Sequence, residues 1–182
     1  MSQEEQIAQA VHSILMAVGD DPQREGLRLT PQRVAHMYGE LLDGMGKDPE
    51  EALSTVFEED TQNGLVILKA IPFFSICEHH LLPFYGRADI GYVPNGRVAG
   101  ASKLARALDI LAHRLQLQER LTTSLANAVF RALSPKGVGV VISAEHLCMI
   151  VRGVKKPGSA VVTTAYRGDF PQEEFLALVQ RS

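Results

Sequence analysis

The sequence predicts an α+β fold in which an N-terminal helical segment precedes an antiparallel β-sheet with helices packed on one face. Three patterns lead to this prediction. Apolar residues recur at helical spacing in the first third of the 182 residues, β-branched and aromatic runs begin at Leu65, and two further helical stripes separate those runs from a second strand-like group. We expect a helical region over residues 1–60 and a second region, which carries the sheet and its helices, over residues 61–182, joined as one structural unit.

The helices of the first region are predicted from their start signals. Thr30-Pro31 places a hydroxyl N-cap before a proline at the first helical position, and Asp48-Pro49 repeats the signal with acidic residues behind it. The first helix is predicted from its apolar stripe and from the Gly19–Pro22 stop that follows it. The expected helices cover residues 7–18, 30–44 and 48–56.

The elements of the second region are predicted from changes in the spacing of apolar residues along the chain. Proline and glycine at Pro83 and at Pro94-Asn95-Gly96 separate apolar, β-branched segments, and leucines at helical spacing follow. We expect strands at residues 65–68, 88–93, 138–142, 146–151 and 160–166, and helices at residues 104–115, 121–132 and 171–181.

Composition excludes several functional classes. Eighteen Lys and Arg against 21 Asp and Glu give a net charge of −3, so no overall positive field gathers nucleic acid or an anionic membrane. An anionic ligand must then be held by a local cluster. No apolar run approaches the ~20 residues of a membrane span and no basic leader opens the chain, so we expect a cytoplasmic protein whose two cysteines stay reduced.

The densest polar cluster, residues 77–80, interrupts an apolar and aromatic segment. Cys77 and His80 have the spacing that directs a thiolate and an imidazole at one ion, and Cys148 follows His146 by two residues in a predicted strand, on the same face. Three ligands would leave the fourth position to water, as in catalytic zinc sites, with His79 and His146 beside it. The alternatives are inert thiols, a disulfide, or histidines that are satisfied at a strand end.

A second cluster is cationic. Its members open a predicted helix or follow the Cys148 segment, and a hydroxyl, an ammonium and guanidinium groups near a helix N-terminus suit a polyphosphate. The alternative is a solvated surface. The cluster comprises Ser102, Lys103, Arg106, Arg152, Lys155 and Lys156.

A third candidate is Glu119, at the break between the two central helices. A carboxylate there complements a guanine edge, because it accepts from both the ring N–H and the exocyclic amine. The alternative is helix capping or an ion pair with Arg120.

Five segments together resemble the signature blocks of the GTP cyclohydrolase I family, and the resemblance runs from about Asp20 to Phe170. It implies the tunnelling fold, in which the sheets of several subunits join into a barrel, and a homodecamer of two pentamers with shared active sites. The segments are Thr30–Ala35, Cys77–Phe84, Gly100–Arg106, Gln116–Thr122 and Glu145–Met149 with Arg152–Val154.

The resemblance also implies an activity and a role for each matching residue. The family converts GTP and water to 7,8-dihydroneopterin triphosphate and formate, the first step toward tetrahydrofolate and other pterins. The implied zinc ligands are Cys77, His80 and Cys148, and the implied catalytic residues are His79 and His146. Gln118 and Glu119 match the guanine site, whereas the triphosphate site is matched by Ser102, Lys103, Arg106 and Arg152, with Arg33 reaching it from a neighbouring subunit.

Three other functions remain open from the sequence. A different tunnelling-fold enzyme of pterin or deazapurine metabolism would not need the complete Cys77, His80 and Cys148 set. A noncatalytic GTP- or pterin-binding paralogue would not need both His79 and His146. A structural zinc module would need a fourth protein ligand, and the sequence offers no second pair at metal-binding spacing.

Overall fold

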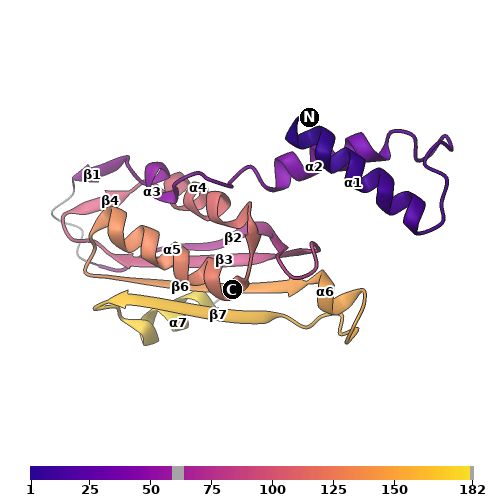
Figure 1. Ribbon diagram of the computed structural model, residues 1–182. Coiled ribbons are helices and arrows are strands. Elements are labelled where there is room, and N and C mark those ends of the chain that lie inside the picture. The colour runs from indigo at the N-terminus through magenta and orange to yellow at the C-terminus, as the bar shows by residue number, and fades with distance from the viewer. Residues whose placement is uncertain (59–63, 181–182) are drawn as a thin grey trace. The chain divides into compact units, whose positions relative to one another are not determined.

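The computed structural model describes residues 1–58 and 64–180, and the chain divides into two compact units, Met1–Asp43 and Gly44–Ser182. The domain boundary expected at residues 60 and 61 lies outside the described residues. No helix among the described residues has the length and apolar character required to cross a bilayer. The elements of both units are labelled in Figure 1.

The first unit consists of α1 (Gln3–Ala17) and α2 (Thr30–Leu41). A capping box begins α1: the Ser2 hydroxyl accepts from the Glu5 N–H at 3.1 Å, and the Glu5 carboxylate accepts from the Ser2 N–H at 2.7 Å. Proline in the first turn of α2 confirms the predicted helix start, but the predicted hydroxyl cap is wrong, because Leu29 and not Thr30 is the N-cap and no side chain caps the helix. Both predicted helices are therefore present.

The second unit is built on a five-stranded sheet of order β5-β2-β3-β6-β7. All of its pairs are antiparallel except a two-residue parallel pair between β2 and β5, which the sequence did not predict. The strands are β2 (Val66–Cys77), β3 (Pro83–Val93), β5 (Leu115–Gln116), β6 (Gly137–His146) and β7 (Val161–Gly168). A separate pair joins β1 (Val56–Glu58) to β4 (Arg97–Ala99), near the short α3 (Pro49–Ala52).

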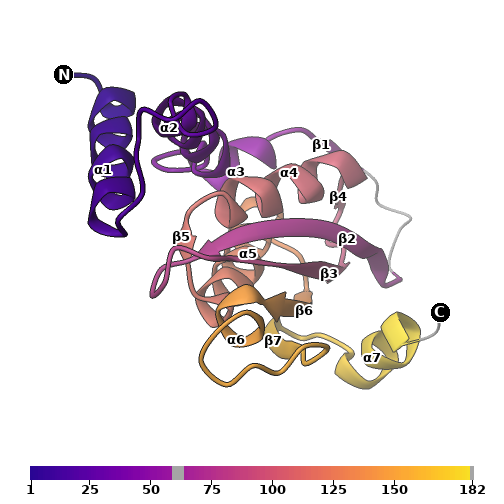
Figure 2. The same cartoon turned by 90° about the vertical axis from the view of Figure 1, so that its right-hand side faces the viewer.

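Two helices, α4 (Ala101–Ala112) and α5 (Gln118–Leu133), cover one face of this sheet (Figure 1). Successive residues of β6 face opposite sides of the sheet. Val140 and Ile142 are buried in the main core with α4 and α5, while Val141 belongs to a second cluster on the opposite face. That second cluster joins Val141 to Phe170 and to Phe175 of α7 (Gln172–Gln180), a helix that also lies beside β7 in Figure 2. The predicted α+β class is confirmed, with α7 as an addition on the other face.

One predicted strand is wrong and it bears on the site. The expected strand at residues 146–151 is instead the end of β6 followed by a single helical turn, α6 (Leu147–Ile150), closed by the Val151 N–H to the Leu147 carbonyl at 3.0 Å. The last β3–β6 pair is Phe84 with His146, and Pro83, the next residue of β3, has no N–H to extend the ladder. Cys148 thus reaches the site from a helical turn and not by strand alternation.

Candidate active site

The β2–β3 turn carries the polar cluster at residues 77–80. Cys77 closes the turn at both of its backbone groups: its N–H donates to the Leu82 carbonyl and its carbonyl accepts from the Leu81 N–H, each at 2.9 Å. Leu81 adopts a left-handed conformation, with φ of 53°, to complete the turn. This geometry buries Cys77 inside the sheet end and leaves His79 and His80 exposed.

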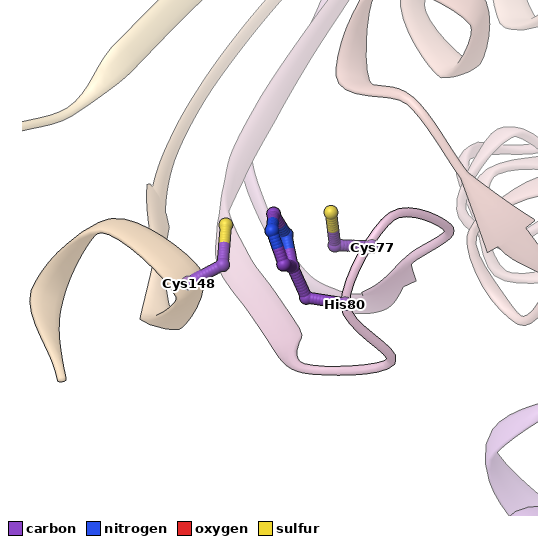
Figure 3. A group of neighbouring side chains, drawn as sticks. All are labelled: Cys77, His80 and Cys148. Atoms are coloured by element: carbon purple, nitrogen blue, oxygen red, sulfur yellow. The ribbon is translucent and has the colours of Figure 1, made fainter. Parts of the chain in front are cut away.

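The turn and α6 bring Cys77, His80 and Cys148 together. Their ligand atoms all lie within 4.8 Å of one another, and both cysteines are free thiols (Figure 3). Burial raises the pKa of the Cys148 thiol, and the adjacent Cys77 raises it further. Two thiols beside an imidazole form a donor set that a soft cation stabilises. These three residues could therefore hold a metal ion.

Arg152 contacts two of these three residues. Its guanidinium donates to His80 Nε2 at 3.1 Å and to the Cys148 carbonyl at 3.3 Å. A cationic side chain thus contacts one candidate ligand atom, His80 Nε2. Arg152 is the member of the predicted cationic cluster that the structure places beside these three residues.

His146 lies at the end of β6 with its ring fixed on two sides. Phe84 stacks against it with ring centroids 4.6 Å apart and an interplanar angle of 1°, and Gln118 Oε1 lies 2.8 Å from its Nε2. Burial lowers the pKa of His146, and the carboxylate of Glu119 opposes that shift. Glu119 is exposed in the first turn of α5, so both residues predicted at the guanine site lie beside His146.

An ion pair that the sequence did not predict joins the β2–β3 turn to α5. Arg120 donates to the two carboxylate oxygens of Glu78 at 2.6 and 3.1 Å, and this hydrogen bonding lowers the pKa of Glu78. Arg120 therefore pairs with Glu78 and leaves Glu119 without this partner. In the sequence, the only sign of this ion pair is that Glu78 and Arg120 each lie next to a candidate site residue.

Three other predicted residues of the second unit do not join this group. Ser102, Lys103 and Arg106 lie in the first half of α4, whereas the last residue of that helix, Ala112, accepts a hydrogen bond from Ser75 near the end of β2. Ten residues of helix separate Ser102 from Ala112, about 15 Å at the helical rise. Arg33 is exposed on α2 in the first compact unit.

Sequence reasoning missed the aromatic and hydroxyl groups around the site. His113, expected on a helix surface, ends α4 half-buried and stacks on Phe74 with ring centroids 4.6 Å apart. Thr163, which belongs to no recognised motif, accepts from the Gln118 amide at 3.1 Å, and Thr122, at the end of the Gln116–Thr122 segment, donates to the Gln118 backbone carbonyl at 2.7 Å. The contacts of Phe74 with His113 and of Gln118 with Thr163 join residues 39 and 45 apart, so no local pattern identifies them.

Comparison with known proteins identifies the family. The GTP cyclohydrolase I family model matches residues 7–180. A GTP cyclohydrolase 1 of Dehalococcoides mccartyi is 53% identical over 100% of this chain and 99% of its own length, and one of Halalkalibacterium halodurans is 54% identical over 97% and 96%. One of Streptococcus agalactiae is 50% identical over the whole of both chains.

Among solved structures, the archaeosine synthase QueF-Like in the apo form covers 59% of this chain and 96% of its own, at 23% identity and a TM-score of 0.44. The assignment is made by the family model and the full-length relatives. On those two findings, this chain belongs to the GTP cyclohydrolase I family.

Proposed function

We propose that this protein is a zinc-dependent GTP cyclohydrolase I, which converts GTP and water to 7,8-dihydroneopterin triphosphate and formate. The observation that carries the proposal is the convergence of Cys77, His80 and Cys148 within 4.8 Å, at the same end of the sheet as His146 and Glu119, in a member of this family. Cytoplasmic location and entry of the product into tetrahydrofolate synthesis follow from the same proposal.

Cys77, His80 and Cys148 would hold the zinc ion. Three protein ligands are the number that catalytic zinc sites use, and thiolate and imidazole are ligands that zinc prefers over the hard cations. When bound there, zinc supplies Lewis-acid activation of water for attack on the guanine ring. His80 would have to release the hydrogen bond from Arg152 if it uses Nε2 as the ligand atom.

The histidines would move the protons that ring opening requires. His146 is held beside the first turn of α5, and His79 lies next to His80, with ring centroids 6.1 Å apart. Glu119 would accept from the guanine N1–H and the exocyclic amine, which places the base against the ring of His146. One histidine then faces the base, while the other, exposed, is available to the ring nitrogen or ribose oxygen that is protonated later.

The site is completed by another copy of the chain in this proposal. Ser102, Lys103 and Arg106 would bind the triphosphate, but about 15 Å of α4 separates them from the metal-binding end of the same sheet. A second copy that presents its α4 N-terminus, with Arg33 of α2 from a neighbour, would supply the missing cations. We propose a decamer of two pentamers with shared sites.

The first experiment measures formate and, after oxidation, the fluorescent pterin from GTP with the metal-replete protein. Wild type and the control His36→Ala, an exposed residue of α2, should both form product, whereas Cys148→Ser should lose zinc and turnover. Stoichiometric zinc without product from GTP would refute the enzyme and favour a noncatalytic binding protein. A Cys148→Ser protein with full zinc and activity would refute the ligand assignment.

A second experiment tests whether each active site is built from two copies of the chain. Arg106→Ala and His146→Ala should each be inactive alone, and refolding them together should restore part of the activity, because some sites receive an intact residue from each copy. No recovery in mixed oligomers would refute a site built from two chains.

A further inference from the structure

We infer that Gln118 is a positioning residue that fixes the tautomer of His146, with the hydrogen on Nε2 and with Nδ1 left as the nitrogen that exchanges protons with the substrate. The resemblance places Gln118 at the guanine, whereas its side chain in this chain is 1% exposed and points into the protein. The catalytic consequence rests on the proposed function, but the tautomer itself does not.

The orientation of the Gln118 amide is determined by two carbonyl groups. Its Nε2 lies 3.1 Å from the Ile142 carbonyl of β6 and 2.8 Å from the Val161 carbonyl of β7. Carbonyl oxygens only accept, so the nitrogen must face them, since a flipped amide would bring its own oxygen against both. Oε1 is therefore the atom turned toward His146.

The neighbouring hydroxyls support the same orientation. Thr122 Oγ1 lies 2.7 Å from the backbone carbonyl oxygen of Gln118 and must donate to it. The single hydroxyl hydrogen of Thr122 is then used, so Thr122 accepts from Thr163 Oγ1 at 2.6 Å. Thr163, having given its hydrogen away, is free to accept from the Gln118 amide at 3.1 Å. The two N–H groups of the Gln118 amide thus face three acceptors and no donor, and Gln118 and Thr122 are both 1% exposed, so water has little access to either.

The tautomer of His146 follows from this orientation. An amide oxygen only accepts, and it lies 2.8 Å from Nε2, so Nε2 carries a hydrogen. The parallel stack on Phe84 fixes the plane of the ring and the amide fixes its rotation within that plane. On a neutral ring Nδ1 is then the acceptor, and within the described residues it has no hydrogen-bond partner.

The decisive readout is solid-state nitrogen NMR of the zinc-loaded, histidine-labelled protein at about pH 8.5, where a histidine of ordinary pKa is neutral. The His146 signals are assigned by their loss in His146→Asn. We expect a protonated nitrogen at Nε2 and an unprotonated one at Nδ1 in the wild type. A hydrogen on Nδ1 would overturn the inference, and this measurement requires neither a Gln118 variant nor activity.

A pair of variants tests the role of Gln118. Gln118→Met removes the acceptor at similar size and should give mixed tautomers, a kcat for formate release about 10²-fold lower, and a KM for GTP and a zinc content near wild type. Thr163→Val, the matched control, removes one partner of the amide but keeps the contact with His146, so its tautomer and kcat should stay near wild type. A raised KM with unchanged kcat in Gln118→Met would make Gln118 a guanine contact and overturn the inference. If no variant or wild type turns over GTP, the proposed function fails while the NMR result still decides the tautomer.

Discussion

Gly86 offers the sharpest test of how the sheet supports the site. It lies in β3 opposite Ala144 of β6, and a Cβ built on it would lie 2.6 Å from the Ala144 Cα and 2.8 Å from the Ser143 carbonyl carbon. Carbon atoms in contact lie about 3.5–4.0 Å apart, so Gly86→Ala requires the two strands to separate by about 1 Å. The obstructing atoms belong to backbone, so no side-chain rotation can relieve the contact.

The expected cost combines two effects. Overpacking costs about 1–3 kcal/mol, and weakening the ladder hydrogen bonds on either side costs about 1 kcal/mol each, so we expect the free energy of unfolding to fall by about 3–5 kcal/mol. Two residues away, Phe84 of the same strand pairs with His146 and stacks on it. A displacement of about 1 Å there should lower kcat on the order of 10²-fold in the protein that remains folded.

The measurement is urea denaturation followed by circular dichroism at one fixed protein concentration, because the stability of an oligomer depends on concentration. Formate release at saturating GTP gives kcat. The control is Gly39→Ala in α2, where an added Cβ meets nothing within 4 Å and should stabilise by about 0.5–1 kcal/mol. A Gly86→Ala protein with the unfolding midpoint and kcat of wild type would refute the reasoning.

Three further predictions concern stability. Phe175→Ala removes a fully buried ring that packs on Phe170 at 5.2 Å and should cost about 3–5 kcal/mol while sparing kcat, because α7 lies away from the site; a loss below about 1 kcal/mol in urea denaturation would contradict this role. Ser134→Gly should stabilise by about 0.5–1 kcal/mol, since Ser134 caps α5 in a left-handed conformation with φ of 48°, and a lower unfolding midpoint would argue against that strain. Burial raises the pKa of Tyr92 despite a hydrogen bond from the Ala99 N–H, so its neutral form supplies stability that is present below about pH 10 and is lost as pH rises through the folded pKa. Tyr92→Phe should flatten that alkaline loss in denaturation curves from about pH 9 to 11, and an equally steep loss in the variant would assign it to another group.

The order and type of most elements followed from the sequence, but the length of the first long strand did not. β2 runs to Cys77 through Lys69 and Pro72, which break its apolar pattern, and through a bulge at Ala70, where φ is 54°. The Asp89 carboxylate of β3 accepts from the Ala70 N–H at 2.8 Å and stabilises this bulge. That partner lies 19 residues away, so a prediction based on neighbouring residues ended the strand too early.

The same distinction explains which site residues the sequence could identify. Cys77 and His80 share one turn, so their spacing predicts that both can reach one ion, and the structure brings them together. Gln118 instead depends on Ile142 and Val161, 24 and 43 residues away, which decide which atom of its amide faces His146. The family resemblance gave Gln118 the role of a guanine contact, whereas burial and the direction of each hydrogen bond favour a role in orienting the imidazole. The chemistry of this site is therefore set as much by the sheet that holds His146 as by the residues that spacing identifies.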